Sequence, residues 1–217
     1  MQPDYKNIVN FENGLNSDII TTLENSFEKA VAQTKDFAEQ FRGRNILESC
    51  ENVWNYLKNN VPYVADSVEH QKIILPARLI ERAEKNIGAD CKSFSLFAAS
   101  ILANLYPNAK ICFRYVSFRT SKTPTHVYCV VKTSKGIIIV DAVWHSFNSQ
   151  KDYTHKIDHE MKISTLSGID DKRLIVDAYT YNLIKHNLDA AKKLKLIWIS
   201  PSSCKENELV LVQTYKQ

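Results

Sequence analysis

The stretch Ala89-Asp90-Cys91-Lys92-Ser93-Phe94-Ser95 places a cysteine where a loop turns into an apolar helix. Apolar residues surround nearly the whole of this helix, predicted over residues 91–105, which is typical of a helix in the protein interior. Asp90 is a good N-cap, because its carboxylate can accept from N–H groups of the first turn. The sulfur of Cys91 is therefore predicted at the positive end of a buried helix dipole.

Two later segments carry the other side chains that a reactive thiol needs. They are Pro124-Thr125-His126-Val127-Tyr128 and Ile139-Val140-Asp141-Ala142, and both read as strands. A thiol attacks a carbonyl group as the thiolate, which a helix N-terminus and an imidazolium both favour. The backbone N–H of Cys91 can stabilise an oxyanion, since first-turn N–H groups lack intrahelical partners. Cysteine, histidine and aspartate together are the smallest set for thiolate acyl transfer.

The spacing of these segments allows His126 and Asp141 to meet. Thr133-Ser134-Lys135-Gly136 predicts a tight hairpin between two strands. In that register the two side chains are diagonal neighbours on one face, about 7–8 Å apart at the backbone. An odd loop without a bulge would place them on opposite faces. The predicted pairs are Thr133 with Gly136, Val130 with Ile139, Tyr128 with Asp141 and His126 with Val143.

The remaining elements predict an α+β fold in which the core helix packs on an antiparallel sheet. We expect an N-terminal helical extension over 1–45 and a catalytic core over 46–147. A C-terminal loop, helix and short β tail over 148–217 would pack on that core. Helices are predicted over 17–41, 46–59, 77–86, 91–105 and 170–193; strands over 110–119, 125–132, 136–144, 194–199 and 208–214; and irregular structure over 62–75 and 148–168.

Composition narrows the class of protein. The chain has 217 residues, of which 44% are hydrophobic and 24% charged, so it is globular rather than disordered. A net charge of +4 is too small and too scattered to indicate a nucleic-acid partner. No stretch reaches the roughly 18 apolar residues of a membrane span, and the first residues lack a signal peptide. We therefore expect a cytoplasmic protein, or a virion-associated one if it is phage-encoded; its oligomeric state stays open.

The other cysteines and histidines predict neither a disulfide framework nor a metal site. The five cysteines are odd in number and form no CxxC pair. Cys50, Cys112 and Cys129 lie on apolar helix or strand faces, which favours core packing. His155 and His159 have i, i+4 spacing but lack an HExxH motif and fall in a predicted loop. No metal and no cofactor is predicted.

The order of these motifs resembles the transglutaminase-like superfamily, a branch of the papain-like fold, in its bacterial or phage-associated members. The matching pieces are Asp90-Cys91, His126-Val127-Tyr128 and Val140-Asp141, and Gln71-Lys72-Ile73-Ile74-Leu75-Pro76 upstream adds to the likeness. The resemblance covers about 50–147 and departs from the family at Ala89, where glycine is usual.

The resemblance implies a role for each residue of the candidate site. Cys91 would be the nucleophile, His126 the general base and acid, and Asp141 the residue that orients the histidine. Gln71 is the candidate side-chain donor to the oxyanion. Trp144 follows Asp141 closely in the chain and would line the site.

Two functions from different classes follow. The first is an enzyme that transfers an acyl group from an amide or peptide bond of a peptide or protein through a thioester. It is a peptidase or amidase when water accepts the acyl group, and a transglutaminase when an amine does. The alternative is a catalytically silent binding or structural module, for instance virion-associated.

A redox sensor is disfavoured, because no resolving cysteine is near in sequence. Cys91 alone would be a small buried hydrophobe, but Asp141 inside an apolar strand needs a partner.

Overall fold

The computed structural model describes residues 7–12, 15–162, 173–176, 196–198 and 209–213. The chain divides into two compact units, Met1–Ile163 and Ser164–Gln217. Within the described residues, no helix combines the length and apolar character required to cross a membrane. The protein is an α+β chain with antiparallel sheets, as its sequence predicts.

The second unit contains a three-stranded antiparallel sheet in the order β7-β9-β8. Its strands are β7 (Arg173–Val176), β8 (Leu196–Trp198) and β9 (Leu209–Gln213). The two short strands expected at the end of the chain are confirmed. The helix expected over 170–193 is wrong at residues 173–176, where Arg-Leu-Ile-Val pairs with β9; the rest of that helix lies outside the described residues.

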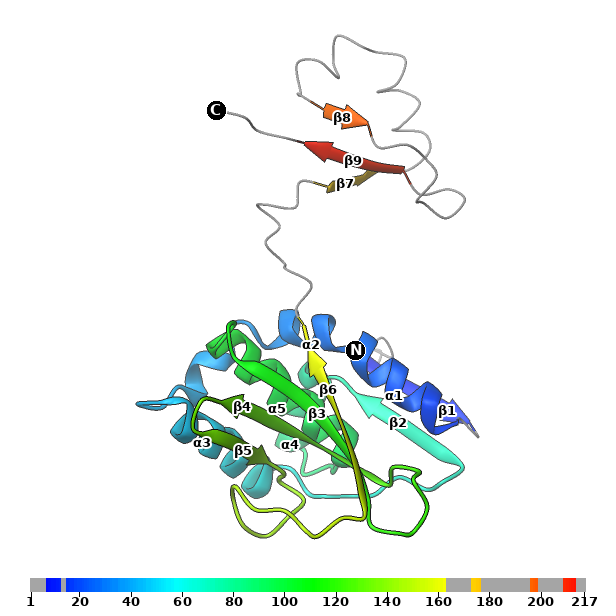
Figure 1. Cartoon of the computed structure of the whole chain (residues 1–217), viewed down its shortest axis with the longest axis vertical. Coiled ribbons are helices and arrows are strands. Elements are labelled where there is room, and N and C mark those ends of the chain that lie inside the picture. Colours follow the sequence, from blue (N-terminus) through cyan, green and yellow to red (C-terminus); the bar gives the residue numbers. More distant parts are fainter. Residues whose placement is uncertain (1–6, 13–14, 163–172, 177–195, 199–208, 214–217) are drawn as a thin grey trace. The chain divides into compact units, whose positions relative to one another are not determined.

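A four-stranded antiparallel sheet in the order β5-β4-β3-β6 is the centre of the first unit. Helix α5 (Cys91–Leu105) packs across one face of it (Figure 1). The three strands and the buried core helix predicted for residues 91–144 are confirmed, with ends that differ by a few residues. The strands are β3 (Lys110–Ser117), β4 (His126–Thr133), β5 (Gly136–Val140) and β6 (His155–Met161).

Strand β6 corrects the expectation that residues 148–168 are irregular. It pairs with β3 over seven residue pairs, from Ser117 with His155 to Ile111 with Met161. Its polar residues give no apolar alternation, because β6 is an edge strand with much of its surface in solvent. The buried guanidinium of Arg114 donates to both carboxylate oxygens of Asp158, at 2.7 and 2.9 Å. The compact unit therefore extends beyond the expected core boundary at 147.

The N-terminal helices are built into the same core. The single helix expected over 17–41 is divided, and Ser26 at the break donates its hydroxyl to the carbonyl oxygen of Thr22 at 2.7 Å. Val31 and Leu102 are buried in one cluster, so the described helices before residue 45 share the core of α5. The helical elements are α1 (Asn16–Asn25), α2 (Phe27–Thr34), the 3₁₀ helix η2 (Ala38–Phe41), α3 (Ile46–Asn60) and α4 (Pro76–Glu84).

A small second sheet corrects the expectation that residues 62–75 are irregular. Strands β1 (Ile8–Glu12) and β2 (His70–Ile74) pair in antiparallel fashion. The backbone N–H of Ile74 donates to Ser93 Oγ at 3.0 Å, so β2 lies against the start of α5. This pairing joins segments some sixty residues apart, which local sequence patterns do not reveal.

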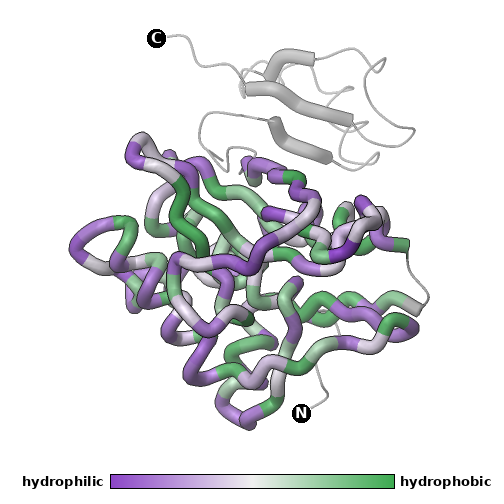
Figure 2. Tube along the Cα trace, turned by 60° about the horizontal axis from the view of Figure 1, so that its bottom comes forward, coloured by the Kyte–Doolittle hydropathy of each residue, from purple (hydrophilic) through white to green (hydrophobic). Residues whose placement is uncertain are grey.

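The apolar core of the first unit is formed around α5. Residues 92–103 of this helix are all buried, and Phe97 stacks on Tyr56 with ring centroids 5.4 Å apart. Figure 2 shows hydrophobic stretches along the strands and inner helices, and mostly hydrophilic residues on the outer loops. The start of α5, and with it Cys91, is therefore held on a rigid element.

Candidate active site

Cys91 is the first residue of α5, and its side chain is only partly buried. Asp90 caps the helix and accepts from the N–H groups of Lys92 and Ser93, the second and third of the helix, rather than from the first. The N–H of Cys91 thus keeps the orientation of an unpaired first-turn donor. Cys91 lines a cleft of about 420 Å³ that α1 and the loop of residues 61–69 flank on either side.

His126 and Asp141 contact each other as the hairpin register predicts. Nε2 of His126 lies 2.8 Å from Oδ2 of Asp141. The predicted pairs Thr133 with Gly136 and Val130 with Ile139 are confirmed. The β4–β5 ladder ends at Val140, so Asp141 follows directly after the last pair. Because Nε2 is taken by the carboxylate, Nδ1 is the ring nitrogen left for a second partner.

Cys91 and His126 line the same cleft, and the Cys91 side chain influences the pKa of the ring. Burial, the largest single influence, opposes the charged ring, but hydrogen bonds to Asp141 and Cys91 and the charges of both outweigh it. Together they raise the pKa of His126 to about 10. The ring is therefore cationic at neutral pH. The three side chains converge as the sequence predicts.

Neighbouring groups hold this arrangement in place. Trp54 on α3 donates its indole N–H to the backbone carbonyl oxygen of Asp141 at 2.8 Å, and the N–H of Val143 donates to Oδ1 of that carboxylate at 3.1 Å. The Ser95 hydroxyl lies 2.6 Å from the carbonyl oxygen of Cys91 and 2.9 Å from that of Val127. One hydroxyl thus connects the helix that begins at Cys91 to the strand that begins at His126.

The structure places Gln71 on the wall of the same cleft as Cys91 and His126. Its amide oxygen accepts from Lys92 Nζ at 2.8 Å, and its amide nitrogen donates to the carbonyl oxygen of Ser67. Gln71 lies on β2, a strand that the sequence pattern did not predict. Its nearness to Cys91 therefore arises from the β1–β2 pairing and from the bond between Ile74 and Ser93.

Trp144 is placed differently. Its indole lies against the ring of His145, with centroids 4.7 Å apart, and it does not line the cleft in the described part of the chain. Tyr63 and Tyr115 are the aromatic residues that line the cleft instead. Sequence reasoning also missed Lys92 and Asp66. A signal existed for Lys92, since a charged residue inside a helix that is apolar all round requires a buried partner.

The other thiols differ from Cys91 in their surroundings. Cys50, Cys112 and Cys129 are buried, which confirms core packing for all three. Burial raises the pKa of each, that of Cys50 to about 12. Cys204 lies outside the described residues. Cys91 is the partly exposed thiol among the four that the structure places, and it is the one in the cleft.

His155 and His159 lie on β6, where i, i+4 spacing separates side chains along a strand instead of bringing them together as on a helix. Nδ1 of His159 contacts Oε1 of Glu24 at 2.5 Å, and its ring packs edge-on against Tyr115. Among the described residues, no three His, Cys, Asp or Glu side chains gather as metal ligands would.

Searches against protein-family models, curated proteins and solved structures found no match to this chain. Function has to be argued from the site itself, since a fold alone does not determine it.

Proposed function

We propose that this protein is a cysteine-dependent acyl-transfer enzyme, related to the transglutaminase-like and papain-like enzymes, that acts on an amide or peptide bond. The observation that carries the proposal is the position of the His126 ring between two partners. Its Nε2 lies 2.8 Å from Oδ2 of Asp141, and the ring lines the same cleft as the side chain of Cys91, which contributes to its raised pKa. This is the arrangement of nucleophile, base and orienting acid that acyl transfer requires.

In the first step, the sulfur anion of Cys91 attacks the carbonyl carbon of the scissile amide and forms a tetrahedral oxyanion. The backbone N–H of Cys91, and the amide of Gln71 on the cleft wall, are the donors available to that oxyanion. The His126 imidazolium gives its proton to the amide nitrogen, the C–N bond breaks, and the amine leaves. The products are a thioester on Cys91, a neutral ring and the free amine.

In the second step, neutral His126 takes a proton from the incoming nucleophile, which attacks the thioester and releases the sulfur anion. Water gives a carboxylic acid and makes the protein a peptidase or amidase. A primary amine gives a new amide and makes it a transglutaminase. Throughout, Asp141 keeps Nε2 of His126 protonated and so directs Nδ1 to the reacting atoms.

A peptide or protein substrate suits the cleft. Its volume of about 420 Å³ is that of a site for a small ligand or a short segment of chain. Its lining includes Ile19 and Ile20 from α1, together with the half-exposed Tyr63 and the almost fully exposed Val68. Such a groove accommodates a polypeptide with apolar side chains on either side of the amide.

The alternative function is a silent binding module, and the exposed apolar rim is the observation that favours it. Val68 is 88% exposed and Tyr63 is 45% exposed, and both line the cleft. Exposed apolar groups that cluster at a groove are typical of partner-binding surfaces. In this reading Cys91 and His126 would be retained for packing, and no thioester would form.

The test is acylation by p-nitrophenyl acetate, an activated acyl donor that requires no knowledge of the natural substrate. We expect a burst of p-nitrophenol and an acetyl group on the peptide that contains Cys91. Cys91→Ala should abolish both, whereas the buried-thiol control Cys112→Ala should leave both unchanged. A burst of equal size from folded Cys91→Ala protein would refute the proposal and leave the binding module.

A further inference from the structure

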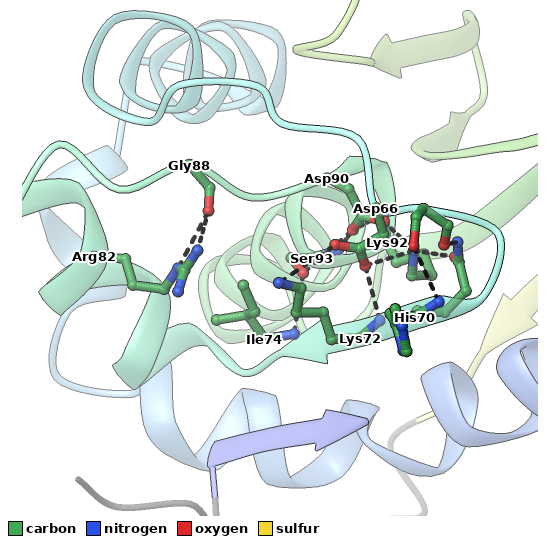
Figure 3. A network of polar contacts seen from close by, with 11 residues as sticks. Asp66, His70, Lys72, Ile74, Arg82, Gly88, Asp90, Lys92 and Ser93 are labelled. Carbon is green, nitrogen blue, oxygen red and sulfur yellow. Dashed lines mark hydrogen bonds and ion pairs between the residues drawn. The ribbon is translucent and has the colours of Figure 1, made fainter. Parts of the chain in front are cut away.

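Lys92, the residue after the proposed nucleophile, is a buried cation with a complete set of acceptors. Its side chain is 7% exposed and forms ion pairs with Asp90 and with Asp66, whose Oδ2 lies 3.4 Å away. The third acceptor is Oε1 of Gln71, at 2.8 Å. An ammonium group has three N–H donors; two of them bond Gln71 and Asp90, and Asp66 adds an ion pair. Figure 3 shows Lys92 between Asp66 and Asp90 in this network.

A contribution to folding stability does not by itself explain why Lys92 is buried with two carboxylates. Burying an ammonium and two carboxylates costs several kcal/mol per ion, and apolar residues of the same volume are often as stable or more so. The carboxylates of Asp90 and Asp66 nonetheless keep Lys92 charged: burial is the largest influence and opposes the charge, yet their attraction raises the pKa of Lys92. A buried cation therefore follows Cys91 directly in the chain.

The contact with Gln71 decides which way that amide faces. The Lys92 ammonium can only donate hydrogen bonds. It therefore bonds the amide oxygen of Gln71 and cannot bond the amide nitrogen. The nitrogen end must then turn away from Lys92, and one of its two N–H groups bonds the carbonyl oxygen of Ser67. The second N–H remains on the amide of a residue that lines the cleft with Cys91.

The same ammonium also holds the loop that forms the cleft wall. The side chain of Asp66 is 8% exposed, although most residues around it in the loop of residues 61–69 are exposed. Besides Lys92, it accepts the backbone N–H of Lys72 at 2.8 Å. Tyr63, Ala65 and Val68 of this loop line the cleft, so Asp66 fixes the loop at its inner side.

We propose that Lys92 is a positioning residue for acyl transfer: it orients the Gln71 amide so that one N–H faces the developing oxyanion. Through Asp66, it also holds the loop of residues 61–69 against the cleft. The inference rests on the proposed function, because it concerns the same thioester-forming step. Lys92 acts through Gln71 and does not touch the reacting atoms.

The test is a double-mutant cycle on the rate constant of acylation by p-nitrophenyl acetate. We expect Lys92→Met and Gln71→Ala each to slow acylation by about 100-fold, the effect of losing one oxyanion donor. The double variant should be little slower than either single one, because both remove the same interaction. Losses that multiply in the double variant would overturn the inference.

Two further variants separate orientation from a purely structural role. Gln71→Glu keeps an oxygen for Lys92 but has no N–H, so it should slow acylation as much as Gln71→Ala does. Lys72→Met is the matched control, since Lys72 Nζ also pairs with Asp66, at 3.8 Å, but does not line the cleft. It should stay within twofold of the wild type. A Gln71→Glu protein as fast as the wild type would equally overturn the inference.

Folding of Lys92→Met is checked by thermal unfolding, because it leaves two buried carboxylates without their cation. Should it not fold, Lys92→Met/Asp66→Asn removes one of those charges and takes its place in the cycle. Failure of the inference is distinct from failure of the proposed function. In the first case acylation still depends on Cys91 but not on Lys92 or Gln71; in the second it does not depend on Cys91.

Discussion

Trp54 donates its indole N–H to the backbone carbonyl oxygen of Asp141, with the two atoms 2.8 Å apart. The bond joins α3 to the end of β5, although the residues are 87 positions apart in the chain. Asp141 comes after the last pair of the β4–β5 ladder, so the sheet no longer holds its backbone. Trp54 therefore supplies one restraint on the backbone of Asp141, in addition to the bond from the N–H of Val143 to the carboxylate.

Trp54→Phe should separate this restraint from packing. The ring of Phe preserves most of the contact with Phe147, whose centroid lies 6.2 Å from that of Trp54. We expect a loss of about 1 kcal/mol in the free energy of unfolding, from the one hydrogen bond, and a several-fold slower acylation measured by the p-nitrophenol burst. Trp144→Phe, outside the cleft, is the control and should acylate normally. Equal rates in both variants would contradict this role for Trp54.

The raised pKa of His126 predicts how the stability of the protein depends on pH. The pKa of the ring is about 10 in the folded protein and 6.5 for an ordinary histidine, so the folded state favours the protonated ring. The stabilisation is complete below about pH 6.5 and is lost as the pH rises toward 10. Urea unfolding should show the stability difference between wild type and His126→Phe shrinking across that window. In an Asp141→Asn background the trend should weaken, and a difference that grows with pH would exclude the assignment.

The four cysteines that the structure places should differ sharply in reactivity. Iodoacetamide at neutral pH should alkylate Cys91 at least ten times faster than Cys50, Cys112 or Cys129, because burial raises the pKa of those three thiols. Peptide mapping by mass spectrometry measures each rate separately. His126→Ala should slow the reaction at Cys91 and leave the other three unchanged. Preferential labelling of a buried thiol would argue against the described site.

Gly88 allows the loop of residues 61–69 to approach the segment before Cys91. A Cβ built on Gly88 would lie 2.5 Å from the carbonyl oxygen of Pro62 and 2.4 Å from Cγ2 of Val64. Gly88→Ala must therefore displace backbone, and we expect a loss of about 1–3 kcal/mol in unfolding free energy. Acylation should slow as well, since Tyr63 of this loop lines the cleft. Chemical denaturation and the burst assay measure both effects, and an unchanged stability would show that the loop moves freely.

The parts of the site that could be predicted from sequence depend on local patterns. Asp90 before an apolar helix predicts the cap, and the two-residue turn at Ser134-Lys135 predicts the register that brings His126 toward Asp141. Both signals lie within a few residues of the features that they predict. The convergence of Cys91 with this hairpin relied on the family resemblance, because helix and hairpin are separate in the chain.

The parts that could not be predicted depend on pairing between distant segments. Gln71 reaches the cleft because β2 pairs with β1, and β6 joins the sheet because Arg114 binds Asp158 on an otherwise polar strand. Neither strand shows the apolar alternation from which strands are predicted. Lys92 was overlooked for the same reason, since its partner Asp66 lies in a loop with no pattern of its own.

The turn at Ser134-Lys135 limits how this chain can change length. His126 and Asp141 lie at the opposite end of the hairpin from that turn. The number of residues in the turn nevertheless decides whether their side chains lie on the same face of the sheet. Inserting one residue there would send one of the two side chains to the far side of the sheet, unless a bulge absorbed the addition. Related chains that keep His126 facing Asp141 should therefore vary this turn in steps of two.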